Sequence, residues 1–108
     1  MYSLTISELA ENDISFTLTY IAKVLTAPMA ANNLLDEIEK YENILEDTPE
    51  IYPRVPDEYL AKQGIRYVII KNFMMFFTVN EEEKTVNVIR FLYGQRDWKY
   101  LLKQGKFI

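Results

Sequence analysis

Residues 65–93 read IRYVIIKNFMMFFTVNEEEKTVNVIRFLY and decide the fold of this chain. The stretch contains three runs rich in β-branched and aromatic residues, the composition that favours strands. Two short polar segments, residues 71–72 and 80–84, separate these runs. Because connections this short join neighbouring antiparallel strands, the stretch predicts a three-stranded meander.

The segment before this meander predicts one more strand and two helices. Apolar and polar side chains alternate over residues 2–7, which is the period of a half-buried strand. Apolar residues then recur at helical spacing over residues 8–26, and again over residues 28–45. The short connection between the two segments predicts an antiparallel helical hairpin.

The chain is expected to form an α+β domain with the element order β-α-α-β-β-β-α. Residues 57–62 predict one helical turn, and Asp97 is placed to cap a short C-terminal helix that ends before Gly105. We therefore predict a four-stranded, mostly antiparallel sheet packed on a helical hairpin, with all 108 residues in a single domain. The central strand, residues 73–79, is apolar on both sides. We expect the C-terminal helix to cover the second face, and a binding groove there is the alternative.

The composition excludes several kinds of chemistry. The chain has no Cys and no His, so it has no disulfides, no Ser-His-Asp triad and no imidazole ligand for a metal. Residues 81–83 are consecutive glutamates and predict a solvated hairpin tip, because no second carboxylate cluster completes a metal site. We expect no cofactor and no metal.

The net charge of −4 conceals two halves of opposite sign. Residues 1–50 contain two cations and ten anions, whereas residues 51–108 contain ten cations and six anions. Such asymmetry points to an interaction surface in the cationic half. No segment resembles a targeting signal or a membrane span, so we expect a cytoplasmic protein with no membrane partner.

Two arginines in the cationic half lie where their neighbours are aliphatic. Arg66 shares the alternation of Val68, and Arg90 shares that of Val88 and Leu92. The pattern predicts both guanidiniums on one face of the sheet, where they would suit a phosphate or a carboxylate. The alternative is that each arginine pairs with an internal carboxylate, such as Glu8, Glu58 or Asp97.

Residues 90–98, RFLYGQRDW, form the most specific motif of the chain. Tyr93 and Arg96 lie where the last strand ends and the C-terminal helix begins, a place where loop side chains and free amide groups converge. A tyrosine can donate a proton there when neighbouring cations assist it. The alternative is a tight turn with an aspartate cap and a tryptophan anchor.

Three stretches resemble one known family. They are YIAKVLTAPMAANNLLDEIEKYENIL (residues 20–45), PEIYP (49–53) and GIRYVIIKNFMMFFTVNEEEKTVNVIRFLYGQRDW (64–98). Together they resemble the RelE/ParE superfamily of bacterial type II toxin-antitoxin toxins, also called plasmid stabilisation proteins, and the resemblance covers nearly the whole chain. It implies the element order predicted above, a toxin that arrests growth, and a cognate antitoxin that wraps the sheet and helices and neutralises the toxin.

The resemblance implies one of two activities. RelE-like toxins cleave mRNA in the ribosomal A site, and ParE-like toxins poison DNA gyrase. RelE-like cleavage uses basic residues on the second and third strands of the sheet, where this chain has Tyr67, Ile69 and Met74. The cationic set of a ribonuclease is thus depleted.

The end of the last strand keeps more of the family pattern. Arg90, Tyr93 and Arg96 match the arginine-rich pattern before the terminal helix, and Arg66 matches a common family arginine. If the chain is a ribonuclease, the resemblance implies that the three arginines stabilise phosphate charge and that Tyr93 takes part in proton transfer.

We expect a ParE-like toxin that targets DNA gyrase, or one that has lost ribonuclease chemistry. The acidic helical half would oppose docking on ribosomal RNA. A RelE-like, ribosome-dependent mRNA endoribonuclease is the alternative. A non-toxic module that only binds its antitoxin is a second alternative.

Overall fold

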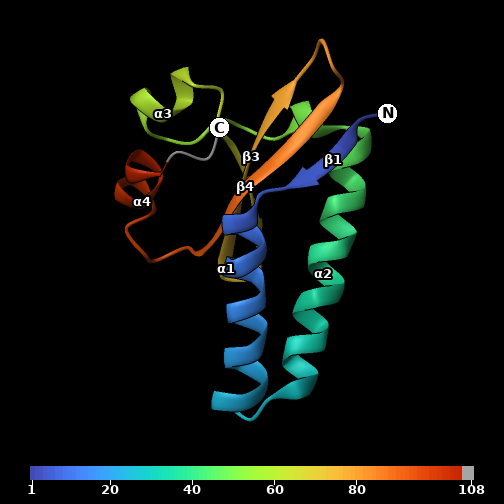
Figure 1. The fold of residues 1–108 in the computed structure, drawn as a ribbon, viewed down its shortest axis with the longest axis vertical. Helices are drawn as coiled ribbons and strands as arrows, with labels where there is room; N and C mark the ends of the chain where they lie inside the picture. The colour runs from blue at the N-terminus through green and yellow to red at the C-terminus, as the bar shows by residue number, and fades with distance from the viewer. Residues whose placement is uncertain (106–108) are drawn as a thin grey trace.

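The computed structural model describes residues 1–105 and has the predicted order of strands and main helices (Figure 1). The elements are β1 (Ser3–Ile6), α1 (Glu8–Thr19), the π-helical turn η1 (Tyr20–Val24), α2 (Pro28–Asp47), the 3-10 turn η2 (Pro49–Ile51), α3 (Glu58–Lys62), β2 (Arg66–Ile70), β3 (Phe73–Asn80), β4 (Thr85–Tyr93) and α4 (Trp98–Gln104). The turn η1 lies within the helix predicted over residues 8–26, but its π-helical geometry and the 3-10 turn η2 were not predicted. No helix within residues 1–105 has the length and apolar composition needed to cross a membrane.

The four strands form one mixed sheet in the order β1-β4-β3-β2. The meander β2-β3-β4 is antiparallel, as its short polar connections predict, and β1 pairs with β4 in parallel from Ser3 opposite Thr85 to Ile6 opposite Val88. Lys71 and Lys84 adopt positive φ angles of 58° and 52° at the two tight connections, the left-handed backbone that closes short hairpins. The α+β fold and its mostly antiparallel sheet are confirmed.

The helical hairpin packs on one face of the sheet and extends beyond its end (Figure 1). One core lies on this side, where Leu34, Ile38 and Leu45 of α2 belong to one buried cluster with the sheet residues Met75 and Phe77. The sheet can bury both faces because β3 alternates between the two sides: Met75 and Phe77 face the hairpin and their neighbours face away.

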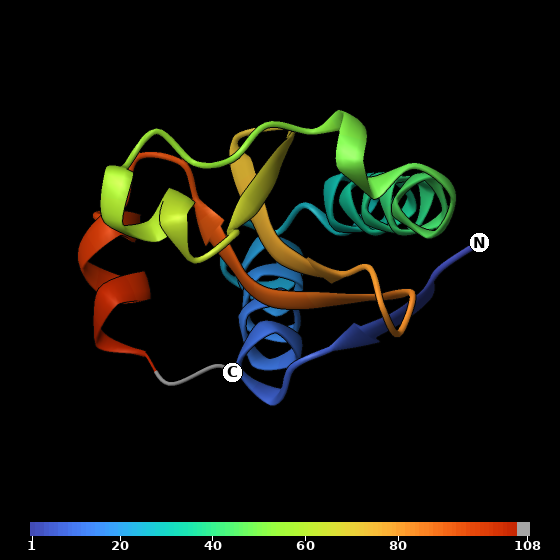
Figure 2. The same cartoon turned by 90° about the horizontal axis from the view of Figure 1, so that it is seen from above.

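A second core fills the opposite face of the sheet. It contains Met74 and Phe76 of β3, Leu60 of α3 and Leu102 of α4, all of them buried. Viewed from above, α3 and α4 lie together on the side of the sheet away from α2 (Figure 2). The C-terminal helix therefore covers the second face as expected, and α3 covers it as well.

A β-bulge interrupts the last strand and corrects one prediction. Phe77 pairs with Val88, but its neighbour Phe76 pairs with Arg90, so Ile89 is an extra residue in β4. Val88 consequently lies in the core on the hairpin side, while Leu92 lies in the opposite core. The alternation that predicted Arg66 and Arg90 on one face does not continue through the bulge, because one added residue reverses the faces of those that follow.

Candidate functional site

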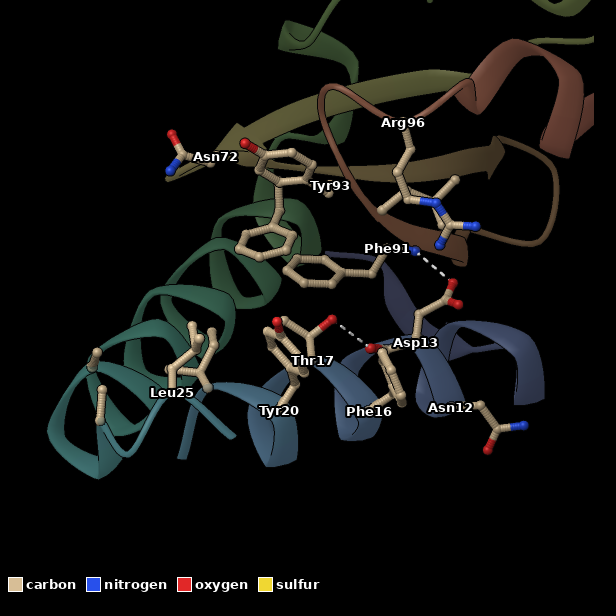
Figure 3. A pocket seen from close by; sticks show the side chains of 15 residues that line it. Asn12, Asp13, Phe16, Thr17, Tyr20, Leu25, Asn72, Phe91, Tyr93 and Arg96 are labelled. Atoms are coloured by element: carbon tan, nitrogen blue, oxygen red, sulfur yellow. Dashed lines mark hydrogen bonds between the residues drawn. The ribbon is translucent and has the colours of Figure 1, made fainter. Parts of the chain in front are cut away.

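A groove of about 840 Å³ lies between the helical hairpin and the end of the sheet (Figure 3). Phe16, Tyr20 and Leu25 supply one wall from α1, η1 and the residue after η1, and Phe91 and Tyr93 of β4 lie across from them. Phe16 is 72% exposed and Leu25 is 53% exposed. Large apolar side chains left exposed together around a concave surface mark a binding site for another molecule.

Aromatic rings give the sheet side of the groove a defined shape. The ring of Phe73 stacks on that of Phe91 with centroids 5.1 Å apart, and the ring of Tyr93 meets Phe73 edge-on at 5.8 Å. On the hairpin side, Phe16 stacks on Tyr20 at 6.3 Å. The π-helical turn brings Tyr20 and Leu25 onto the same wall, since the Leu25 N–H donates to the Tyr20 carbonyl across the wider turn.

Asp13, which lines the groove, forms an ion pair with Arg90. Arg90 Nε lies 2.7 Å from Asp13 Oδ2, Arg90 Nη2 lies 3.0 Å from Asp13 Oδ1, and both side chains are about 15% exposed. The Phe91 N–H also donates to Asp13 Oδ2 at 3.0 Å (Figure 3). Strand β1 ends at Ile6, opposite Val88. Further along the edge of β4, the Asp13 side chain accepts the backbone N–H of Phe91 in place of a strand partner.

The partner of Arg90 was therefore missed at the level of sequence. An internal carboxylate is one of the two alternatives predicted for Arg90, but Asp13 is not among the candidates Glu8, Glu58 and Asp97. One feature of the sequence could have identified Asp13 as the partner. Asp13 lies one helical turn after Ala10, and Ala10 is fully buried on the packed side of α1, so the two residues share that side. Only the fold shows that this side of α1 meets β4 after the bulge.

Arg66 lies apart from the groove, and no groove-lining residue contacts it through a hydrogen bond or ion pair within residues 1–105. Its Nη1 donates to the Tyr52 carbonyl, and its backbone bridges Arg54 in the segment that flanks the outer edge of β2. The two arginines predicted to share one face are thus held by different partners. The structure does not bring Arg66 together with Arg90, Tyr93 and Arg96.

Tyr93 and Arg96 both line the groove. The Arg96 N–H donates to the Tyr93 carbonyl at 3.0 Å, and the Gly94 N–H donates to the Asn72 carbonyl at 2.8 Å, so the loop is fixed to the β2–β3 turn. A Cβ at position 94 would lie 3.2 Å from that carbonyl, which favours glycine there. The Arg96 side chain is exposed and has no ion pair within residues 1–105.

The polar groups of the groove are better suited to binding than to acid–base chemistry. Asp13 already accepts three hydrogen bonds, so both of its oxygens are occupied. The chain has no imidazole, and no group of three or more potential metal ligands occurs in the described part of the chain. What remains is an apolar surface with Arg96 as a cation at its rim, an arrangement that fits an apolar segment carrying a carboxylate.

Comparison with known proteins supports this description of the fold. Residues 4–98 match the model of the family described as the ParE toxin of type II toxin-antitoxin systems, parDE. The chain is similar to a structure of the chromosomal ParDE system from P. aeruginosa, with 21% identity, a TM-score of 0.68, and coverage of 86% of this chain and 96% of that one. No match is found among curated proteins.

A second solved structure has the same fold. It is the toxin-antitoxin complex RelBE2 from Mycobacterium tuberculosis, with 14% identity, a TM-score of 0.60, and coverage of 85% of this chain and 96% of that one. At these identities the two likenesses establish the fold alone, and the family match rests on the sequence of residues 4–98.

Proposed function

Because the chain belongs to the family of ParE toxins of type II toxin-antitoxin systems, we propose that this toxin arrests bacterial growth in the cytoplasm by binding DNA gyrase and not by cleaving RNA. The observation that carries the proposal is the state of the candidate catalytic side chains. Arg66 is bound to the Tyr52 carbonyl, and Arg90 is bound to Asp13. Only Tyr93 and Arg96 are left at the groove, without an imidazole to move a proton near neutral pH.

The alternative is a RelE-like, ribosome-dependent mRNA endoribonuclease. In that reaction Arg66, Arg90 and Arg96 would stabilise phosphate charge, and Tyr93 would take part in proton transfer. The separation of Arg66 from the other three argues against one shared phosphate site. The acidic residues of the first half of the chain also weaken docking on an RNA surface.

The target is tested by expressing the toxin without its antitoxin. Inhibition of gyrase predicts growth arrest with SOS induction and filamentation, and purified toxin is expected to inhibit supercoiling by purified gyrase. Primer extension on translated transcripts is expected to show no cuts in the ribosomal A site. Cuts that disappear in Arg96→Ala would favour the ribonuclease instead, and unimpaired growth would favour a module that only binds its antitoxin.

The groove is the proposed docking site for the cognate antitoxin. Its apolar walls and the exposed Arg96 fit an amphipathic segment whose apolar side chains enter the groove and whose carboxylate meets the guanidinium. Both similar structures belong to toxin-antitoxin systems, the ParDE system in one case and the RelBE2 complex in the other. This supports such a partner for this chain.

Phe16→Glu tests this docking site, because the side chain is exposed and its loss costs the fold little. Affinity for the antitoxin, which we expect the adjacent reading frame to encode, should fall about tenfold or more in a copurification assay. Ile51→Glu is the matched control, since Ile51 is 65% exposed on η2, outside the groove. Equal antitoxin binding by the two variants would place the antitoxin elsewhere.

A further inference from the structure

The outer side of α4 is a basic and aromatic surface that the groove does not use. Lys99, Tyr100 and Lys103 are exposed and recur at i, i+1 and i+4, with Tyr59 of the neighbouring helix α3 beside them. Figures 1 and 2 both show α3 and α4 side by side. We call Tyr59, Lys99, Tyr100 and Lys103 the α3–α4 patch.

The inner side of α4 holds this patch in place. Leu102 is fully buried against the sheet, and Trp98 packs on Phe76 with ring centroids 5.4 Å apart. The two faces of α4 are thus distinct, one apolar and packed, the other charged and aromatic. The patch is therefore presented on a fixed support.

Cations and rings are interleaved across the patch. Lys103 Nζ lies 5.9 Å from the centroid of the Tyr59 ring, and Lys99 Nζ lies 5.7 Å from that of Trp98. The rings of Tyr59 and Tyr100 nonetheless stay open, with 62% and 58% of each residue exposed. Exposed rings beside ammonium groups can bind a ligand that is both anionic and flat-faced.

The carboxylates near the patch already have partners. Asp97 accepts the Tyr100 N–H at the start of α4, and Asp57 accepts the Leu60 N–H at the start of α3 while pairing with Lys103 at 3.2 Å. Glu58 pairs with Lys62. Lys99 has no ion pair within residues 1–105, so its charge is available to an anion from outside.

We propose that the α3–α4 patch binds single-stranded nucleic acid, with the bases stacked on Tyr59 and Tyr100 and a phosphate beside Lys99. Stacking suits any base because every base has a π-face, and the Lys99 ammonium neutralises a backbone phosphate without reading sequence. A duplex keeps its bases stacked on each other and offers the tyrosines no free base. This surface is separate from the groove, and its binding of nucleic acid does not depend on the proposed gyrase target.

Fluorescence anisotropy with 5′-labelled (dT)15 and (rU)15 tests the proposal on the purified full chain at low salt. Both strands are expected to bind, because the patch has no group that requires or excludes a 2′-hydroxyl. Both should bind better than a labelled duplex, because the bases of a duplex stay stacked on each other. The logarithm of the binding constant should fall with the logarithm of salt concentration by about 0.7 for each phosphate neutralised.

Two variants separate the contributions of charge and stacking. Lys99→Gln should lower the affinity and reduce the salt slope by about 0.7. Tyr100→Ala should lower the affinity about fivefold or more and leave the salt slope unchanged. Lys23→Gln and Met29→Ala are the controls, because both side chains are exposed on the helical hairpin, outside the groove and away from α4 (Figure 1).

Three results would overturn the proposal. They are the absence of saturable binding by the wild-type chain, patch variants that bind as well as the control variants, and tighter binding to duplex than to either single strand. Circular dichroism of each variant confirms its fold. Growth arrest and antitoxin binding do not enter this measurement, so its failure leaves the proposed function untouched.

Discussion

A single hydroxyl joins three distant parts of the chain. Tyr2 Oη lies 2.8 Å from Glu81 Oε1 at the β3–β4 turn and 3.1 Å from Glu50 Oε2 on η2. The hydrogen bond to Glu81, burial and the hydrogen bond to Glu50 together raise the pKa of Tyr2 to about 12. The same contact with Tyr2 holds the pKa of Glu81 below its ordinary value.

Tyr2 is therefore expected to make stability depend on alkaline pH. The pKa in the folded state lies above the ordinary value of 10.0, so the folded state holds the proton more tightly than the unfolded chain does. This contribution is complete below pH 10 and is lost as the pH rises towards about 12. The free energy of unfolding, measured in urea across this range, should fall more steeply for the wild type than for Tyr2→Phe.

The phenylalanine variant also serves as the control, because it keeps the ring and every other titrating group. Near neutral pH its curve should run parallel to that of the wild type. The two curves should diverge in the alkaline range, where Tyr2 titrates, and in the acid range, where loss of the Tyr2 contact raises the pKa of Glu81 towards its ordinary value. Parallel curves for the two proteins between pH 10 and 12 would contradict the raised pKa of Tyr2 and the part that its hydrogen bond to Glu81 plays in raising it.

At the scale of elements, the junction of β1 and α1 depends on Ser7. Its Oγ accepts the Ala10 N–H at 3.1 Å as the N-cap of α1 and donates to the Ile89 carbonyl at 3.0 Å. Its backbone N–H donates to the Val88 carbonyl. One residue thus begins the helix and fastens it to β4 beside the bulge.

Ser7→Ala is expected to lower the free energy of unfolding by about 1–2 kcal/mol, because it removes a helix cap and leaves the Ile89 carbonyl without that donor. Urea denaturation measures the change. Ser3→Ala on the exposed side of β1 is the matched control and should stay within about 0.5 kcal/mol of the wild type. Equal losses of stability in the two variants would show that the side-chain hydrogen bonds of Ser7 stabilise the fold no more than the exposed hydroxyl of Ser3 does.

At the scale of the whole molecule, one sheet supports two cores. Phe77 is buried on the hairpin side and Phe76 on the side of α3 and α4, and the two are adjacent in β3. Trp98 is the only tryptophan and packs on Phe76. Its fluorescence reports on the second core, whereas the circular dichroism of the long helices reports on the first.

We expect the two cores to unfold together. Phe76→Ala and Phe77→Ala should each lower the free energy of unfolding by about 3–5 kcal/mol. For each variant, tryptophan fluorescence and far-UV circular dichroism should give one common midpoint, since both cores share β3. A fluorescence midpoint that falls in Phe76→Ala while the dichroism midpoint stays would mean that the α3–α4 side opens as a separate unit.

Local patterns determined much of this molecule from the sequence. Alternation over residues 2–7, helical spacing from residue 8 onward and the short polar turns after residues 70 and 79 predicted every strand and long helix, because each signal lies within a few neighbouring residues. The apolar central strand similarly predicted cover on both faces of the sheet. The absence of histidine limits the chemistry of the chain whatever its fold.

Which side chains meet depends on the packing of distant segments. The bulge at Ile89 ended the alternation on which the placement of Arg90 rested, and Asp13, 77 positions away, proved to be its partner. The groove likewise combines side chains from α1, η1 and β4, which are far apart in the chain. An added residue reverses the faces of a strand and a contact between distant segments depends on how the elements pack, so neither is written in a local pattern.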